Sequence, residues 1–367
     1  MPELELLLGG DVMTGRGLDQ VMRRPGDPTL HESWVKSAVE YVDLAERQNG
    51  PIPRKVDPTY VWGDALAILS DAAISARIIN LETAVTDQGE PWPDKGIHYR
   101  MNPGNVDVIR VAQIDCCVLA NNHALDWSYT GLTQSMASLH GAGLATAGAG
   151  VDAEGAEQPV SIPMGQDRAV VVVALGQSSS GIPRDWAAGP DRPGVAFAGS
   201  LSENEVGKVA QRVAATAQPG DLVVVSIHWG PNWGYHIPRS HQRFARDLID
   251  HAGVHVVHGH SSHHPLGIEV YRDRPILYGC GDLINDYEGI QGHEQFHPEI
   301  SVLYLATMDA EEGRLRRLEL VPMRVRRFRL EHAAPEKVSW LAAALNREGA
   351  SLGTRLNEAD GRLVVAW

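Results

Sequence analysis

The hydrophobic positions of this chain fall into short runs separated by longer amphipathic stretches. Several runs are mostly apolar, as parallel strands buried on both faces are. They lie at residues 4–8, 77–79, 116–120, 170–175, 222–226, 254–257 and 276–278. Toward the C-terminus the pattern changes to alternation, which is typical of antiparallel strands with one solvated face. The alternating runs are residues 300–305, 318–320 and 323–325.

Between these strands the apolar residues recur at helical spacing. The spacing predicts helices at residues 31–48, 63–73, 130–139, 203–217, 238–252 and 336–345. Pro238 near the first turn and Gly253 just past the end of one helix show the expected asymmetry of helix termini. Residues 176–198 are rich in Ser, Gly and Pro and predict a long surface loop. The alternation predicts one α/β domain over residues 1–367, with a C-terminal helical extension at residues 330–367.

Five of the apolar runs end in polar groups able to do chemistry. The loops at the carboxyl ends of strands meet in one crevice in α/β folds, so we expect one shared site. The groups at these five ends are Asp11, then Asn80 and Glu82, then Asn121, Asn122 and His123, then His228, and finally His258, His260, His263 and His264.

Each polar end has a functional and a structural interpretation. Asp11 follows two glycines and suits a metal ligand or a base, or it caps the next loop. Asn80 and Glu82 share one face of an extended segment, or serve as a cap and a salt-bridge partner. Asn122 and His123 suit a metal or a substrate oxygen, with Asp126 orienting the imidazole of His123. A capping network for the following helix is the alternative.

The histidines around Gly259 form the strongest single cluster. Four imidazoles in seven residues suit zinc, manganese or iron, and equally suit acid–base work near neutrality. We expect His260 and one other in the site. His228 alone would be a satisfied core histidine, but it ends a strand. Trp229 and Trp233 flank His228. They either line a groove for an apolar side chain or a sugar, or pack in the hydrophobic core.

Composition and charge exclude several classes of binding partner. The formal net charge is -14, which argues against nucleic acid and anionic membranes. The three cysteines, two of them adjacent, suggest neither a disulfide framework nor a thiolate zinc site. The first strand is too short for a signal peptide, and no apolar run approaches the roughly 20 residues of a membrane span. We expect a cytoplasmic protein without a membrane anchor; the oligomeric state is left open.

These segments together resemble the CapA family, named after proteins of poly-γ-glutamate capsule synthesis. The family resembles the calcineurin-like metallophosphoesterases, so the resemblance implies an α/β fold of the αββα sandwich type with a two-metal site. The motifs that carry it are Gly10-Asp11-Val12-Met13, Asn80-Leu81-Glu82-Thr83, residues 120–126, His228-Trp229-Gly230, residues 259–264 and Gly279-Cys280-Gly281-Asp282.

Three departures from the metallophosphoesterase motifs affect the expected chemistry. Met13 stands where a histidine is expected, and Ser262 stands where the last histidine is expected. The motif that would contain the bridging aspartate is replaced by Asn80-Leu81-Glu82. A two-metal phosphoesterase needs both ions. We therefore expect no essential metal or other cofactor.

Soluble members similar to this chain include the epimerases of lasso-peptide precursors. The first hypothesis is accordingly a metal-independent peptide epimerase, with Asp11 and one of His293, His297 or His260 as acid and base. A loop made of residues 279–282 and 285–289, which precedes His293, would close the pocket. The peptide substrate would be bound by Asn80, Glu82, Asn122, His123, His228, Trp229 and Trp233.

Two alternatives remain open. The second hypothesis is a hydrolase of phosphoester or poly-γ-glutamate-type bonds that depends on manganese, iron or zinc. Its ligands would be Asp11, Glu82, Asn122, His228, His260 and His263. The third is a binding module that escorts a peptide or polymer without catalysis.

Overall fold

The computed structural model describes residues 3–71, 73–165 and 168–367 of the chain. Within these residues, two large β-sheets have ten and seven strands. The larger sheet has the order β20-β21-β18-β17-β1-β2-β5-β6, with β16 beside β1 and β19 beside β18. Its strands are β1 (Glu3–Val12), β2 (Ile74–Leu81), β5 (Cys116–Val118), β6 (Ala145–Ala147), β16 (Asp282–Ile284), β17 (Ile300–Asp309), β18 (Leu315–Arg326), β19 (Arg329–His332), β20 (Arg355–Ala359) and β21 (Arg362–Ala366).

The smaller sheet has the order β11-β9-β12-β13-β15-β14, with β8 beside β9. Its central strands are parallel and Val-rich, as the continuous apolar runs predicted. The strands are β8 (Val160–Gly165), β9 (Arg168–Gln177), β11 (Phe197–Ala198), β12 (Leu222–His228), β13 (Val256–His260), β14 (Ile268–Tyr271) and β15 (Arg274–Leu277). Two short pairs complete the strands: β3 (Ala84–Val85) with β4 (Arg100–Met101), and β7 (Ala149–Gly150) with β10 (Gly194–Val195).

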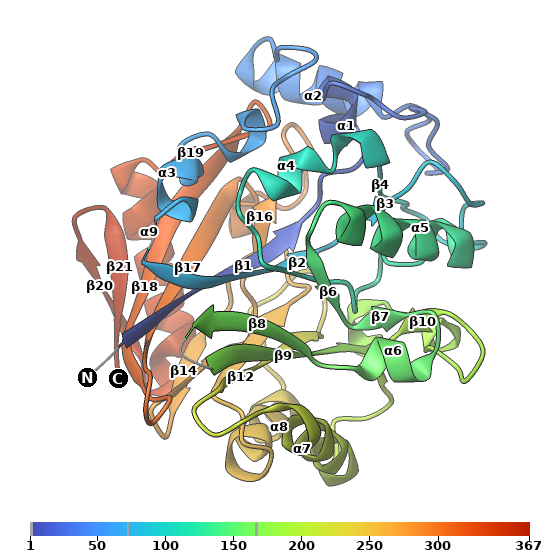
Figure 1. Ribbon diagram of the computed structural model, residues 1–367. Helices are drawn as coiled ribbons and strands as arrows, with labels where there is room; N and C mark the ends of the chain where they lie inside the picture. The colour runs from blue at the N-terminus through green and yellow to red at the C-terminus, as the bar shows by residue number, and fades with distance from the viewer. Residues whose placement is uncertain (1–2, 72, 166–167) are drawn as a thin grey trace.

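The helices lie outside the two sheets (Figure 1). Those with α-helical geometry are α1 (Gly17–Val21), α2 (Val39–Asn49), α3 (Ala65–Leu69), α4 (Asp107–Arg110), α5 (Ser128–Gly141), α6 (Ala153–Glu157), α7 (Glu203–Thr216), α8 (Arg239–His251) and α9 (Pro335–Gly349). Short 3₁₀ turns are η1 (Tyr60–Trp62), η2 (Pro103–Asn105), η3 (Ser178–Ser180), η4 (Arg184–Trp186), η5 (Glu294–Phe296) and η6 (Ala350–Leu352).

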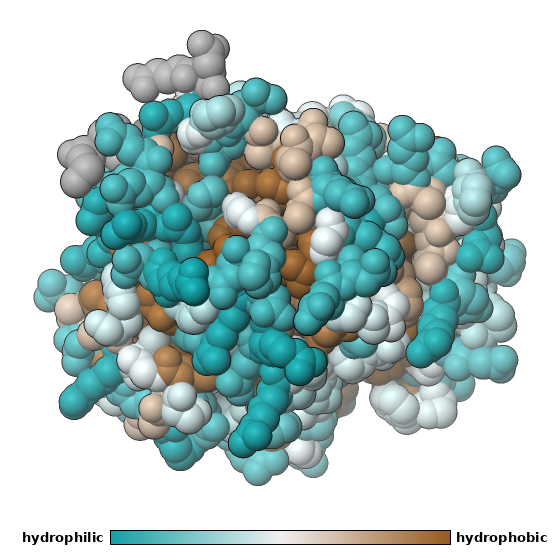
Figure 2. All heavy atoms as spheres, turned by 90° about the horizontal axis from the view of Figure 1, so that it is seen from below, coloured by the Kyte–Doolittle hydropathy of each residue, from teal (hydrophilic) through white to brown (hydrophobic). Residues whose placement is uncertain are grey.

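Alternation along the strands produces the layers. Successive side chains of a strand point to opposite faces, so Leu6 and Leu8 of β1 pack against Val172 and Val224 of the smaller sheet in a shared core. Leu7 points the other way, into a core with the first helices. The far face of the smaller sheet packs on α7 and α8, whose outward side is mostly hydrophilic (Figure 2). The order of layers is therefore helices, sheet, sheet, helices (Figure 1).

Several sequence predictions are confirmed and others need correction. Helices α5, α7 and α8 coincide with their predicted spans within about two residues, as is usual for helix ends. The helix predicted at residues 31–48 begins only at Val39, because Glu32 leaves the helical path to meet Arg16. The helix predicted at 63–73 ends at Leu69, and residue 72 lies outside the described residues.

Three further segments differ from the prediction. Residues 176–198 are not a plain surface loop, since they contain both β10 and β11 and bury Trp186 completely. The two runs at 318–320 and 323–325 form the single strand β18. The expected helical extension contains α9, but β20 and β21 add a hairpin to β18 in the larger sheet, which brings the C-terminus close to the N-terminus (Figure 1). Within the described residues, no helix has the length and hydropathy needed to cross a membrane.

Candidate metal centre

Strand register brings the predicted polar ends together. Asp11 on β1 pairs with Asn80 on the parallel strand β2 and, on its other side, with Asp282 on β16. In the smaller sheet His228 on β12 pairs with His260 on β13. Because the two sheets pack face to face, the carboxyl ends of these strands converge. The predicted single site is present at this point, and its members are almost completely buried.

Asp11 is held from both sheets. Its Oδ1 accepts a hydrogen bond from Asn80 Nδ2 at 2.7 Å, and its Oδ2 accepts one from the backbone N–H of Ser261 at 3.2 Å. Ser261 has φ of 104°, a conformation that side-chain-bearing residues rarely adopt and that functional sites tolerate. Asn121 Nδ2 donates to Asn80 Oδ1 at 3.0 Å, so the amide of Asn80 is fixed with its nitrogen toward Asp11.

Glu82 lies beside this pair. Asn80 Nδ2 also donates to Glu82 Oε2 at 3.2 Å, and Glu82 Oε1 lies 3.7 Å from His123 Nε2. Glu82 Oε2 lies 4.0 Å from His228 Nε2. Asn122 Oδ1 lies 2.9 Å from the same His228 nitrogen. Glu82 and Asn122 therefore lie beside His123 and His228, and Glu82, expected as a possible metal ligand, belongs to neither group of ligand atoms described below.

Two groups of ligand atoms share Asp11. In the first, atoms of Asp11, His228 and His260 lie within 4.8 Å of one another, and in the second the same holds for Asp11, His263 and Asp282. Imidazole nitrogens and carboxylate oxygens are the donors that zinc, manganese and iron accept. The residues present therefore fit two such ions, and Asp11 would be a ligand available to both.

The structure adds one residue, Asp282, to the ligands expected from the sequence. Asp282, which the sequence suggested only as part of a pocket-closing loop, belongs to the second group. Its Oδ1 lies 2.8 Å from His263 Nδ1, and its Oδ2 accepts a hydrogen bond from Asn285 Nδ2 at 2.9 Å. Asp282 comes after the apolar strand β15, just as the other polar groups come after apolar strands. The pattern of polar groups after apolar runs could therefore have identified Asp282 as well.

Burial and mutual repulsion shift the ionisation of the centre. Burial first, and then the charge of Asp282, raise the pKa of Asp11 to about 7. Burial and the charge of Asp11 raise the pKa of Glu82 well above its ordinary value. Burial also lowers the pKa of His228 and His260 far enough to keep both imidazoles neutral, the form that binds metals. Carboxylates gathered in a dry site with neutral imidazoles favour cations.

His123 is oriented by its neighbours, as proposed for Asp126. Asp126 Oδ2 lies 2.6 Å from His123 Nδ1, and Lys95 Nζ donates to Asp126 Oδ1 at 2.5 Å. Burial lowers the pKa of His123 to about 4, against the opposing charge of Asp126. The carboxylate selects the tautomer with hydrogen on Nδ1, so Nε2 of His123 faces Glu82 as an acceptor.

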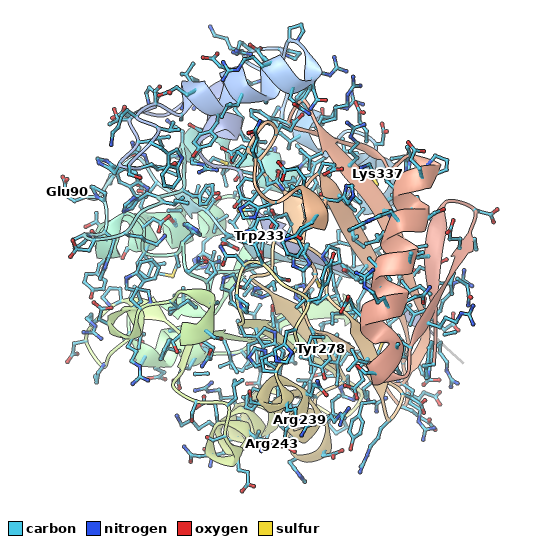
Figure 3. All side chains as sticks on the ribbon, turned by 180° about the vertical axis from the view of Figure 1, so that it is seen from behind. Glu90, Trp233, Arg239, Arg243, Tyr278 and Lys337 are labelled. Atoms are coloured by element: carbon cyan, nitrogen blue, oxygen red, sulfur yellow. The ribbon has the colours of Figure 1, made fainter. Side chains whose placement is uncertain are left out.

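A cavity of about 750 Å³ opens beside this centre. His263 lines the cavity and also belongs to the second ligand group. Trp233 and His293, both expected at the site, form one wall with stacked rings 4.0 Å apart. Trp233 lies near the middle of the molecule in Figure 3. Of the residues in the two ligand groups, His263 lines the cavity, whereas Asp11, His228, His260 and Asp282 do not.

Other expected site residues lie elsewhere. Trp229 is 2% exposed and stacks on His241 with ring centres 4.4 Å apart, so it belongs to the core of the smaller sheet and not to a substrate groove. His297 Nδ1 lies 2.9 Å from Glu299 Oε1 and 2.9 Å from Lys337 Nζ. Lys337 is on α9 (Figure 3), which turns His297 away from the cavity. The structure corrects both assignments.

The two remaining histidines of the cluster are structural. His258 Nε2 donates to the Gly9 carbonyl at 3.0 Å and thereby joins the two sheets. His264 stacks on Phe296 with ring centres 4.6 Å apart. Of the four histidines in this cluster, His260 and His263 are the ones that belong to the two ligand groups.

Comparison with known proteins assigns the family once this geometry is known. The family model described as bacterial capsule synthesis protein PGA_cap matches residues 5–287. The chain belongs to this family.

The chain is also similar to individual named proteins. A "probable polyglutamine synthesis accessory protein" of Mycobacterium tuberculosis H37Rv is 47% identical over 352 residues, which cover 96% of this chain and 92% of the relative. The "PGA biosynthesis protein CapA" of Bacillus subtilis is 28% identical over 76% of this chain and 62% of its own length. The "capsule biosynthesis protein CapA" of Bacillus anthracis is 25% identical over 77% of this chain and 60% of its own length.

Sequence reasoning placed Asp286 and Tyr287 in the loop expected to close the pocket, but it missed Arg16, Glu32 and Tyr99 beside the cavity. Arg16 Nη1 lies 3.0 Å from Glu32 Oε1, and Arg16 Nε donates to Asp286 Oδ2 at 3.1 Å. Tyr287 OH lies 3.4 Å from His263 Nε2, and Tyr99 OH donates to Tyr287 OH at 3.2 Å. None of the aromatic residues ends an apolar strand, so the strand-end pattern carried no signal for them.

Proposed function

We propose that this protein is a metal-dependent hydrolase that cleaves an amide bond in a glutamyl- or glutaminyl-type chain, on an αββα sandwich of the metallophosphoesterase type. The observation that carries the proposal is the position of Asp11 in two ligand groups at once. A carboxylate within reach of both ligand groups suits a site that holds two ions close together, as two-metal hydrolytic sites do. The layer order of helices, sheet, sheet and helices supports the fold assignment.

The substrate class follows from the names of the relatives. The Mycobacterium tuberculosis relative is named for polyglutamine synthesis, and the Bacillus relatives for PGA or capsule biosynthesis. Such chains are built of repeated amide bonds. A hydrolase that trims or releases a chain would serve as an accessory to its synthesis.

The residues of this chain divide the work. Asp11, His228 and His260 would hold one divalent ion of the manganese, iron or zinc class, and Asp11, His263 and Asp282 a second. When bound, such ions act as Lewis acids toward the scissile group. Asn80 and the N–H of Ser261 keep Asp11 oriented.

His123 is the residue placed for proton transfer. The Asp126 carboxylate holds hydrogen on Nδ1, and Nε2 faces the centre beside Glu82. An imidazole oriented in this way can move a proton at Nε2 to or from a leaving group. Lys95, paired with Asp126, keeps the orienting carboxylate ionised.

The test measures metal content and amide hydrolysis together. Protein stripped with EDTA is reloaded with manganese, iron or zinc and incubated with short oligo-γ-glutamate, oligo-α-glutamate and oligoglutamine peptides, with a phosphoester as comparator. We expect new amino groups to appear from a peptide only after reloading. Equal activity of the stripped and reloaded protein, or hydrolysis of the phosphoester alone, would overturn the proposal.

A second candidate, peptide epimerisation, is favoured by one observation. The pKa of Asp11 is raised to about 7 by burial and by Asp282, which suits proton exchange near neutrality, and His293 lines the adjacent cavity. Epimerisation without metal predicts deuterium at Cα when EDTA-treated protein and a peptide are incubated in deuterium oxide. Mass spectrometry that finds no deuterium would remove this candidate.

A further inference from the structure

The cavity beside the metal centre has a composition of its own. Its walls come from the segment before α2, from α2, from the loop after β12 and from the loop between β16 and η5. Most members are aromatic, aliphatic or amide side chains. The lining includes Arg16, Tyr41, Tyr99, Trp233, Tyr287 and His293.

Aromatic rings form a large part of the lining. Trp233 and His293 are nearly parallel, with an interplanar angle of 5°, and Tyr99 and Tyr287 are joined through their hydroxyl groups. Trp34, which is 66% exposed, also belongs to the lining. Large exposed aromatic residues of this kind provide contact area for a ligand at low entropic cost.

The cavity offers no uncompensated positive charge. Among the described residues, Arg16 is the lining side chain with a permanent charge, and it lies between Glu32 and Asp286, both buried. Its guanidinium is also covered by the rings of Tyr41 and Tyr99, at 3.9 and 4.5 Å from their centroids. One cation between two carboxylates leaves a net negative charge.

His263 offers no free charge either. Its Nδ1 lies 2.8 Å from Asp282 Oδ1, so any positive charge on this ring already has a buried partner. A carboxylate entering the cavity would lose water and meet aromatic walls and a net negative cluster. Burying an unpaired charge of this kind is costly.

Uncharged amides find partners at the same place. Asn232 lines the cavity, with Nδ2 at 3.0 Å from His263 Nε2, and the exposed Gln291 lies on the lining as well. The Tyr287 hydroxyl can also donate or accept. A side-chain amide can hydrogen-bond to these groups while its stem packs on the rings.

We propose that this cavity binds an uncharged amide side chain of a glutaminyl-type peptide and rejects the carboxylate of a glutamyl-type peptide. The inference rests on the proposed function in one respect, since it assumes that the bound chain is the one presented to the metal centre through His263. Binding itself needs no ion, so it is measured apart from hydrolysis.

The experiment compares peptides of equal length on EDTA-treated full-length protein. Capped oligoglutamine, oligo-α-glutamate and oligo-γ-glutamate are titrated by isothermal calorimetry. We expect oligoglutamine to bind at least about tenfold more tightly than either acidic peptide, because an unpaired buried carboxylate costs more than the roughly 1.4 kcal/mol of a tenfold change. Trp233→Ala should weaken this binding about tenfold or more, whereas Trp367→Ala, at an exposed C-terminal position, should leave it unchanged.

A gain-of-function variant keeps the inference falsifiable. Gln291→Arg adds a cation at an exposed lining position, so it should fold and improve binding of the acidic peptides. Equal or tighter binding of an acidic peptide by the unmodified protein overturns the inference, as does failure of all three peptides to bind. If oligoglutamine is preferred but no peptide is hydrolysed after metal reloading, the proposed function fails and the binding inference stands.

Discussion

Asp11 and Asp282 are register partners on the parallel strands β1 and β16. Two carboxylates buried side by side repel each other, and burial together with the charge of Asp282 raises the pKa of Asp11 to about 7. A cation bound between them would relieve the repulsion, which is why the pair marks the centre of the proposed site.

Loss of Asp11 should remove both metal ions, because it belongs to both ligand groups. Asp11→Asn is expected to lower the metal content of reloaded protein for both sites, whereas Asp282→Asn should lower it for one. Inductively coupled plasma mass spectrometry measures both. His297→Gln, outside the centre, serves as the control and should retain full loading. Full loading of Asp11→Asn would contradict the assignment.

Loss of the Asp126 carboxylate should impair catalysis through His123. Asp126→Asn removes the acceptor of the Nδ1 hydrogen, and such orienting partners are worth about 10–100-fold in activity or metal affinity. We expect a lower kcat with little change in KM, and a changed pH profile. Asp107→Asn, at an exposed acid paired with Arg110, is the matched control. An unchanged pH profile would argue against the orienting role.

Arg16 should be important for stability because it neutralises two buried carboxylates. Arg16→Met leaves Glu32 and Asp286 without their cation and should cost about 3–5 kcal/mol of unfolding free energy. The control is Arg23→Met, which removes an exposed pair with Asp57 and should cost about 0–1 kcal/mol. Urea denaturation compares the two variants. Equal losses would refute the role of the buried cluster.

Acid should weaken the fold partly through His241. Burial, and then the charge of His236, lower the pKa of His241 to about 4 in the folded protein, against about 6.5 when unfolded. The unfolded state therefore binds the proton first, so this contribution is full above about pH 6.5 and is lost as the pH falls toward 4. His241→Phe keeps the stacking on Trp229. Between pH 7.5 and 5, the unfolding free energy of this variant should fall by up to about 2 kcal/mol less than that of the unmodified protein. Urea denaturation of both proteins at both pH values measures this difference. Equal losses of unfolding free energy in the two proteins would contradict the role of His241.

Gly10 should tolerate no side chain. A Cβ there would lie 1.8 Å from the carbonyl oxygen of Gly281, which would separate β1 from β16 beside Asp11. Gly10→Ala should therefore destabilise the protein and reduce metal loading. Gly207 in α7 has open space around it, so Gly207→Ala should instead stabilise by about 0.5–1 kcal/mol. Thermal unfolding of both variants gives the comparison.

The sequence by itself determined the central parallel strands of the two sheets and the place of the site. Apolar runs and helical spacing are local properties, and the rule that polar strand ends converge needs no knowledge of side-chain direction. Asp11, Asn80, His228 and His260 could therefore be predicted to lie together. The position of Asp126 three residues after His123 was enough to predict their contact.

Only the tertiary structure decided which way the remaining side chains point. Trp229 and Trp233 are four residues apart, yet one packs in the core on His241 and the other lines the cavity. His293 lines the cavity and His297 is drawn to Glu299 and Lys337. The pairing of Asp11 with Asp282 depends on strand register between segments far apart in the chain, and register is set by long-range packing that no local pattern records.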